Sequence, residues 1–252
     1  MQVTSFPFVS QISIGQITIQ IWGLFVALGI ICGTVFAAYR AKTGGLKRSV
    51  VVDLIFWVVV TSVIGAKVAF LIFNGKNGVL GFSSIGAILA GSATVFIVSR
   101  IKKISTSRLM DVFGPPLLLV EGVGRIGCFM LHEHLGKVTD SILGLNILGE
   151  SRHDLGLYFS LAGFAGLLFV LIFEKMGKKR AGAIGAISIL WYFGWRFALE
   201  FLLESSGPFA VTKIYGLTFM QIFSAIMSVV TSFFFLSRVL RKVRVSGAHS
   251  GC

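Results

Sequence analysis

An arginine, a glutamate and two histidines stand directly behind the long apolar run 112–124. They are Arg125, His132, Glu133 and His134. An ionisable side chain inside a bilayer costs roughly 2.5–3.5 kcal/mol on insertion scales, so such a group is a functional candidate by default. Guanidinium groups bind anions, and imidazoles exchange protons near neutral pH. This stretch is therefore where the sequence predicts chemistry.

A second arginine repeats the pattern further along the chain. Glu121 and Arg125 are four residues apart, and so are Arg196 and Glu200, so each pair shares one face of a helix. Two arginines that converge, each beside a carboxylate, would form a cationic site of the size of a phosphate. Each pair could equally be a neutralised ion pair that joins helices. The spacing alone leaves both interpretations open.

The composition indicates a membrane protein. The 252 residues are 55% hydrophobic and 13% charged, with a mean hydropathy of +0.89, whereas soluble domains carry about 25% charged residues. The net charge of +13 is divided into short clusters between apolar runs, which is typical of membrane topology and argues against nucleic-acid binding. Cys32, Cys128 and Cys252 lie far apart, a spacing that predicts neither a metal site nor a disulfide framework.

The elements that must position these groups are apolar helices. A span of about 20 apolar residues crosses the hydrocarbon core. Seven segments qualify: 20–39, 50–73, 79–99, 109–131, 155–174, 182–204 and 214–237. Pro115, Pro116 and Glu121 interrupt the fourth of them. Sixteen of the 23 lysines and arginines follow the first, third, fifth and seventh spans. The positive-inside rule then predicts an outer N-terminus and a cytoplasmic C-terminus.

The ends of the chain complete the predicted all-α, polytopic fold. Ile12, Ile14, Ile17 and Ile19 alternate around Gly15-Gln16, which predicts a small hairpin at the membrane surface. The connection 131–155 is the longest and is expected outside. Residues 1–245 are expected to form one transmembrane domain, followed by a disordered tail at 246–252.

The stretch around Arg125 resembles the signature of the bacterial prolipoprotein diacylglyceryl transferase family. It reads Gly124-Arg125-Ile126-Gly127, then Phe129, Glu133 and Gly136 at the spacing of the family. Several other stretches resemble the family in order and spacing: Trp22-Gly23-Leu24, Ile64-Gly65-Ala66-Lys67, Arg152-His153 with Leu157-Tyr158, Arg196-Phe197-x-x-Glu200-Phe201, and Gly216-Leu217-Thr218-x-x-Gln221. The resemblance covers nearly the whole chain and implies seven spans.

The resemblance implies a reaction at the outer side of the bacterial inner membrane. The family moves the diacylglyceryl group of phosphatidylglycerol onto the cysteine thiol of a preprolipoprotein signal peptide. Arg125 and Arg196 would hold the departing phosphate, with Glu133 and Glu200 orienting them or the headgroup. A base must form the thiolate, which is the nucleophile. The implied partners are the two substrates and the lipid bilayer, with no nucleic acid, metal or organic cofactor.

The chain departs from the family at the groups nearest this chemistry. Cys128 and Leu131 replace two asparagines of the signature, and Ser83 and Ser84 stand where the family has a histidine motif. A family member that only binds phospholipid or modifies another acceptor is therefore one alternative. A transporter is another, although the spans show no matched pair of broken helices.

A substitute for the missing histidine would come from His132, His134 or His153, with the first two preferred. In an extended segment His132 and His134 would point to one side, away from Glu133. On a helix they would lie about 200° apart, so that only one could face the site. The expected substrate-contacting set also includes Trp22, Lys67, Ser83, Ser84, Cys128 and His153, together with Tyr158; the last two could instead be interfacial anchors.

Overall fold

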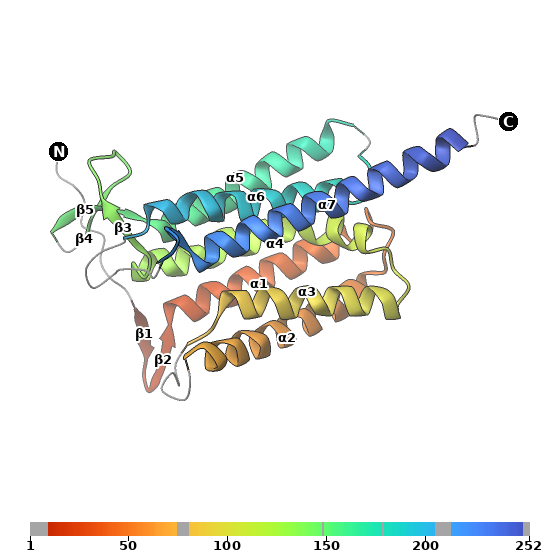
Figure 1. Cartoon of the computed structure of the whole chain (residues 1–252). Coiled ribbons are helices and arrows are strands. Elements are labelled where there is room, and N and C mark those ends of the chain that lie inside the picture. Colours follow the sequence, from red (N-terminus) through yellow and green to blue (C-terminus); the bar gives the residue numbers. More distant parts are fainter. Residues whose placement is uncertain (1–9, 75–80, 148, 178, 205–212, 249–252) are drawn as a thin grey trace.

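The computed structural model describes residues 10–248 except 75–80, 148, 178 and 205–212; of these residues, the side chains of Ile14, Ile17, Asn74 and 238–248 are not described. Within these residues seven α-helices form one bundle, with strands β1 to β5 gathered at one end (Figure 1). The helices are α1 (Ile21–Arg40), α2 (Arg48–Asn74), α3 (Ser84–Ile101), α4 (Thr106–Leu131), α5 (Leu155–Lys175), α6 (Ala183–Leu199) and α7 (Phe219–Ala248).

The described helices are those of a polytopic membrane protein. All except α6 are long and apolar enough to cross a bilayer, and α6 extends into the 3-10 helix η2 (Glu200–Leu202). Large apolar side chains such as Phe73 and Phe233 point outward, as lipid contact requires. The predicted helical fold is therefore confirmed.

The last two helices have different ends from those expected. α6 ends at Leu199 rather than near 204, and α7 begins at Phe219 rather than at 214. The intervening strands β6 (Lys213–Ile214) and β7 (Leu217–Thr218) pair around Tyr215 and Gly216, whose φ angles are 50° and 81°. Two central residues with positive φ characterise a tight hairpin turn, which a helix cannot include. α7 continues to Ala248, inside the expected tail, and 249–252 lie outside the described residues.

α4 is the central helix and packs against α1, α5 and α6. Pro115 and Pro116 are buried within it and do not end it. Glycines allow the close approach of α5: a Cβ on Gly163 would lie 2.6 Å from the backbone nitrogen of Gly122. Small residues at a helix interface are the usual means of tight packing in membranes. α2 and α3 pair chiefly with each other at the edge of the bundle (Figure 1).

Two further β-elements join the helices at the same end of the bundle. The predicted N-terminal hairpin is confirmed: β1 (Gln11–Ile14) pairs with β2 (Ile17–Gln20), and Gly15 in the turn has a φ of 63°. A three-stranded antiparallel sheet was not expected. It consists of β3 (Leu135–Val138), β5 (Glu150–Asp154) and β4 (Leu145–Ile147), in that spatial order, and occupies the connection between α4 and α5.

The two ends of the bundle differ in charge. The described residues of the basic clusters after α1, α3 and α5 lie at the end opposite to the strands, where these helices terminate (Figure 1). The strand end carries the polar connection between α4 and α5. The orientation of these ends in the cell stays a prediction of the positive-inside rule.

Candidate functional site

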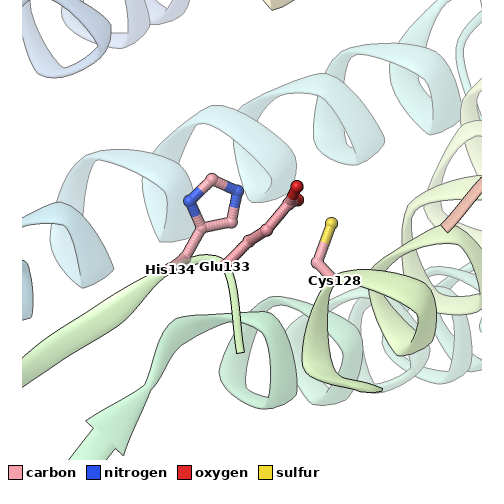
Figure 2. A group of neighbouring side chains, drawn as sticks. All are labelled: Cys128, Glu133 and His134. Atoms are coloured by element: carbon pink, nitrogen blue, oxygen red, sulfur yellow. The ribbon is translucent and has the colours of Figure 1, made fainter. Parts of the chain in front are cut away.

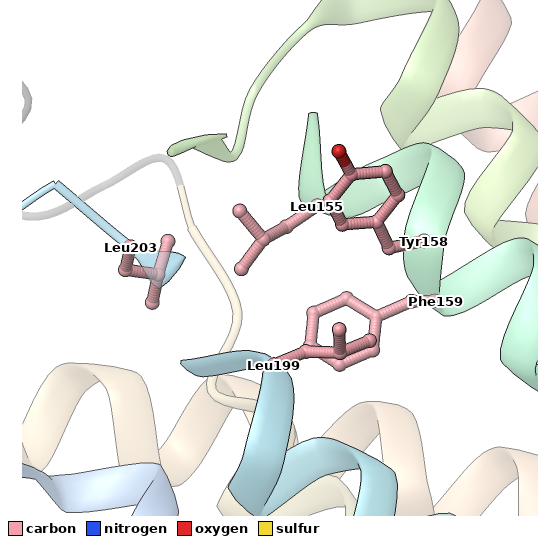
Figure 3. Packing of buried hydrophobic residues seen from close by; sticks show 5 residues of the cluster. All are labelled: Leu155, Tyr158, Phe159, Leu199 and Leu203. Carbon is pink, nitrogen blue, oxygen red and sulfur yellow. The ribbon is translucent and has the colours of Figure 1, made fainter. Parts of the chain in front are cut away.

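One aromatic ring brings the two arginines together near the strand end. The guanidinium carbons of Arg125 on α4 and Arg196 on α6 lie 4.9 and 4.6 Å from the centre of the Phe159 ring on α5. Phe159 is fixed by a cluster of buried apolar residues shown in Figure 3: Leu155, Tyr158, Leu199 and Leu203. Guanidinium groups are attracted to aromatic faces, most strongly away from water. The ring is thus a platform for two positive charges.

Each arginine keeps the carboxylate four residues away as its partner. Arg125 Nε donates to Glu121 Oε1 at 2.8 Å, and Arg196 Nη2 lies 3.2 Å from Glu200 Oε1. Thr218 Oγ1 donates to the other oxygen of Glu200 at 2.6 Å. The Glu200 carboxylate is therefore held from α6 and from the start of α7.

The stretch 216–221 anchors α7 to this carboxylate. The backbone N–H of Gln221 donates to Thr218 Oγ1 at 3.0 Å, and the N–H of Thr218 donates to Gln221 Oε1 at 2.8 Å. This reciprocal pair is a capping box, which satisfies free donors at a helix start. Gln221 Nε2 also donates to the carbonyl of Phe197, at 3.3 Å. The resembling motif thus positions Glu200 through Thr218.

Arg196 keeps donors that no described residue satisfies. The residue is 7% exposed, and its Nε and Nη1 atoms are buried without a hydrogen-bond partner among the described residues. Buried polar groups in native proteins are almost always paired, because an unpaired donor retains its full desolvation penalty. Two unpaired donor nitrogens, on a ring that a second guanidinium also contacts, form a natural receptor for an oxyanion.

A thiol, a carboxylate and an imidazole meet beyond the end of α4. One ligand atom each from Cys128, Glu133 and His134 all lie within 4.8 Å of one another (Figure 2). The cause is His132, which caps α4 in the left-handed conformation with a φ of 50°. This residue interrupts both helical and extended periodicity. Neither the extended nor the helical geometry considered for His132 and His134 therefore applies, and His134 is the histidine that lies beside Glu133.

His132 points to a different partner. Its Nδ1 atom lies 2.6 Å from Asp154 Oδ2, and both side chains are buried. The other Asp154 oxygen accepts a hydrogen bond from the backbone N–H of Leu157 at 3.0 Å and so caps α5. Burial raises the pKa of Asp154, although the hydrogen bond with His132 acts in the opposite direction. His132 thus connects the end of α4 to the start of α5.

His134 lies in the electrostatic field of the arginine pair. Burial, followed by the charges of Arg125 and Arg196, lowers the pKa of His134 to about 3. The imidazole is therefore neutral at pH 7. Because both arginines act on it, the group at Cys128 and the platform at Phe159 belong to one site.

His153 and Tyr158 contact each other and the loop. Tyr158 Oη donates to the carbonyl of Leu143 at 3.2 Å and lies 2.7 Å from His153 Nδ1. Burial lowers the pKa of His153, and the charge of Lys137 adds to the effect. These bonds tie β5 and the loop at Leu143 to α5, and the choice between a site role and an interfacial anchor stays a prediction.

The remaining expected site residues lie on the first three helices or at their ends. The backbone of Trp22 packs on Gly127, where an added Cβ would come within 3.1 Å. Lys67 Nζ lies 5.8 and 5.4 Å from the ring centres of Phe70 and Phe82. The serines face other partners: Ser83 Oγ accepts from the N–H of Gly86 at 3.4 Å as the cap of α3, and Ser84 Oγ lies 3.8 Å from the sulfur of Met220.

Sequence reasoning missed two aromatic residues of the site. Phe159 carries no distinguishing signal in an apolar helix, whereas Tyr192 precedes Arg196 by one helical turn and could have been found by that spacing. A narrow crevice between α4, α5 and α6 joins them, lined by Leu118, Glu121, Phe159, Ala162, Gly163, Trp191, Tyr192, Trp195 and Arg196. It gives the arginine platform an aromatic wall.

Comparison with known proteins places this geometry in a family. The model of the prolipoprotein diacylglyceryl transferase family matches residues 9–237. A phosphatidylglycerol–prolipoprotein diacylglyceryl transferase of Listeria innocua is 29% identical over 232 residues, covering 82% of this chain and 83% of its own. Proteins of the same name from Staphylococcus haemolyticus (30% identical, covering 77% of this chain and 76% of the relative) and Finegoldia magna (29%, 77% and 83%) are also similar. This chain therefore belongs to the prolipoprotein diacylglyceryl transferase family.

Proposed function

We propose that this protein transfers the diacylglyceryl group of phosphatidylglycerol to the cysteine thiol of a prolipoprotein and releases glycerol phosphate. The observation that carries the proposal is the pair of unpaired, buried donors on Arg196, beside Arg125 on one aromatic ring. Membership of the family, and the names of the relatives, support the same substrates.

The arginine platform would bind the phosphodiester of the lipid. As the ester C–O bond breaks, negative charge develops on the phosphate, and fixed guanidinium groups stabilise it most in a site that excludes water. Glu121 and Glu200 hold the two guanidinium groups in place, and Glu200 leaves two nitrogens of Arg196 unsatisfied. The free Nε and Nη1 of Arg196 are then available for phosphate oxygens.

The group of Cys128, Glu133 and His134 would act on the acceptor thiol. The thiol must lose its proton before sulfur attacks the glyceryl carbon. His134 is a weak base without bound phosphate, because burial and then the charges of the two arginines lower its pKa. An anionic phosphate on the arginines would offset those charges and raise the proton affinity of His134. His134, assisted by Glu133, thus replaces the family histidine, and His132 only positions the turn.

The membrane placement follows from the same site. The arginine platform lies near the strand end of the bundle, which the positive-inside rule assigns to the outer side. A prolipoprotein that emerges across the bacterial inner membrane would present its cysteine there. The aromatic crevice beside Arg196 would receive the lipid from between α5 and α6.

The test is transfer by the purified protein. The chain, reconstituted in phosphatidylglycerol bilayers, would be incubated with a lipobox peptide and analysed by mass spectrometry. The proposal predicts a diacylglyceryl adduct on the cysteine and equal release of glycerol phosphate, and no adduct on a peptide with serine in place of that cysteine. Lipid binding without an adduct would instead identify a family member that has lost the transfer, as the replacement of the signature asparagine by Cys128 would allow.

A further inference from the structure

Cys128, Glu133 and His134 form, among the residues that the structure describes, the one cluster of three side chains able to ligate a metal ion. Figure 2 shows the carboxylate of Glu133 between the imidazole and the sulfur. The thiol comes from the last turns of α4, and the other two groups come from the turn that follows it. The cluster therefore offers one sulfur, one oxygen and one nitrogen ligand from a short segment.

This donor set and its dimensions fit a tetrahedral zinc site with one open position. Zinc binds thiolate, imidazole and carboxylate at about 2.0–2.3 Å, so ligand atoms around it lie about 3.3–3.8 Å apart. The three atoms here already lie within 4.8 Å of one another. Glu133 is exposed, so its side chain is able to rotate toward the others. Three protein ligands and one open position characterise catalytic rather than structural zinc.

The charges around the cluster also allow a cation. Arg125 and Arg196 lie near it, but each already faces a carboxylate, Glu121 or Glu200. The thiolate of Cys128 and the carboxylate of Glu133 would add two negative charges. The imidazole of His134 supplies the nitrogen ligand, and neutral imidazole is the form that ligates metals.

We propose that Cys128, Glu133 and His134 hold a zinc ion whose open position takes the thiol of the acceptor cysteine. This inference rests on the proposed transferase function for its catalytic part. A thiol loses its proton when it coordinates zinc, so the proton passes to water and no strong protein base is needed.

The bound thiolate then forms the S–C bond to the glyceryl carbon as the C–O bond to phosphate breaks. The electron pair of that bond leaves with glycerol phosphate, which the arginine platform holds. With zinc bound, His134 and Glu133 act as its ligands and no longer as the base that the metal-free site would use. Cys128, in place of the signature asparagine, supplies the soft donor. The exchange of asparagine for cysteine and the missing family histidine thus have one common explanation.

Cobalt provides the direct test, because a cysteine ligand gives Co²⁺ a sulfur charge-transfer band in the near ultraviolet. The full-length protein, freed of metal by a chelator and kept in lipid nanodiscs, would be titrated with Co²⁺ and then with Zn²⁺. We expect one Co²⁺ per chain, displacement by Zn²⁺, and a stronger charge-transfer band when a lipobox peptide adds its thiolate. The variants C128S, C128N, E133Q and H134Q should bind Co²⁺ at least 10-fold more weakly, whereas C32S, which changes an exposed cysteine on α1, should bind it like the parent.

Thermal unfolding of the metal-free variants would show that each is folded. Absence of saturable Co²⁺ binding in the parent, or equal binding in parent, C128S and H134Q, would overturn the site. Transfer activity, measured with and without zinc, separates the proposed zinc site from the proposed transferase function. Transfer that is equal in chelated and zinc-loaded protein would overturn the catalytic role of the metal and leave the transferase function standing. A cobalt site without any transfer would retain the metal site and contradict the proposed function.

Discussion

Two buried arginine clusters lie at opposite ends of the bundle, and they differ in how fully their donors are satisfied. At the end of α1, Arg40 is 4% exposed and donates to both oxygens of Glu174, at 2.7 and 2.9 Å, and to the carbonyl of Asp111 at 3.0 Å. At the other end, Arg196 has a single carboxylate contact at 3.2 Å, with Glu200. Arg40 leaves only its Nε unpaired, whereas Arg196 leaves both Nε and Nη1.

The comparison separates a structural cluster from a binding one. Arg40 joins α1 to α4 and α5, and the Asp111 carboxylate accepts from the backbone N–H groups of Gly182 and Gly185 at 2.6 and 3.0 Å, which adds α6. Among those groups only the Nε of Arg40 lacks a partner. Arg196 lacks partners at two nitrogens, which an acceptor such as phosphate would supply. A buried arginine is therefore a candidate for ligand binding when several of its donors are unpaired, and not because it is buried.

The largest expected effect is on transfer by R196K. Lysine keeps the charge but lacks the planar fork, so the paired contacts to phosphate oxygens are lost. We expect transfer to fall about 100-fold, which is typical for removal of one transition-state donor, while the folded yield stays near that of the parent. Initial rates of adduct formation, normalised to folded protein, provide the measurement. A parallel loss of folded protein and rate would show that Arg196 is structural.

R40M, at the end of the bundle opposite to the strands, is expected to lower stability but not the rate of transfer. Removing one partner of a buried ion pair leaves the other uncompensated and costs about 3 kcal/mol. Glu174 is partly exposed, so water recovers some of that cost. Chemical or thermal unfolding in detergent should show the loss of stability, while the rate per folded molecule stays unchanged. If R40M lowered the rate of transfer without lowering stability, the Arg40 cluster would not be the structural one.

A smaller effect is expected for T218V. Valine has the shape of threonine but cannot donate to Glu200 or accept from the N–H of Gln221. Leaving these buried groups unpaired costs about 1–3 kcal/mol. Stability should fall, and transfer should fall less than in R196K because Thr218 acts only through Glu200. Unchanged stability would show that the capping box contributes nothing.

The smallest expected effect is on the pH dependence of folding stability. The pKa of His134 is lowered to about 3 in the folded protein, whereas an unfolded histidine titrates near 6.5. The neutral form therefore favours folding above pH 6.5, and this contribution is lost as the pH falls from 6.5 toward 3. The parent should lose more stability than H134Q between pH 7 and pH 5 in metal-free unfolding experiments. Identical pH profiles would contradict the burial of His134 beside the arginines.

The sequence was sufficient for the parts of the fold that follow simple periodicities. Apolar runs predict the helices, the alternation around Gly15 predicts the hairpin, and the four-residue spacing at Arg125 and Arg196 predicts which carboxylate each guanidinium contacts. The strands between α4 and α5 escaped prediction because they are only three to five residues long, with a register shift between Leu135 and Val138.

Other features depend on contacts between distant segments. The left-handed turn at His132 decides which side chains face Cys128, and the enrichment of histidine in that conformation is too weak to predict it from the sequence. Arg40 and Glu174 are 134 residues apart, so no local sequence pattern predicts that they pair. The role of Phe159 could not be predicted for the same reason, because it depends on the packing of α4 and α6, which places two guanidinium groups against its ring.

The most direct test of the account is the affinity of the metal-free protein for glycerol phosphate, the anionic product. Isothermal titration calorimetry would compare the parent with R196K and R40K, a matched pair in which each buried arginine keeps its charge and loses its fork. The account predicts that R196K binds at least 10-fold more weakly, whereas folded R40K binds like the parent. Equal affinity in the parent and R196K would contradict the claim that the unpaired donors of Arg196 form the phosphate site.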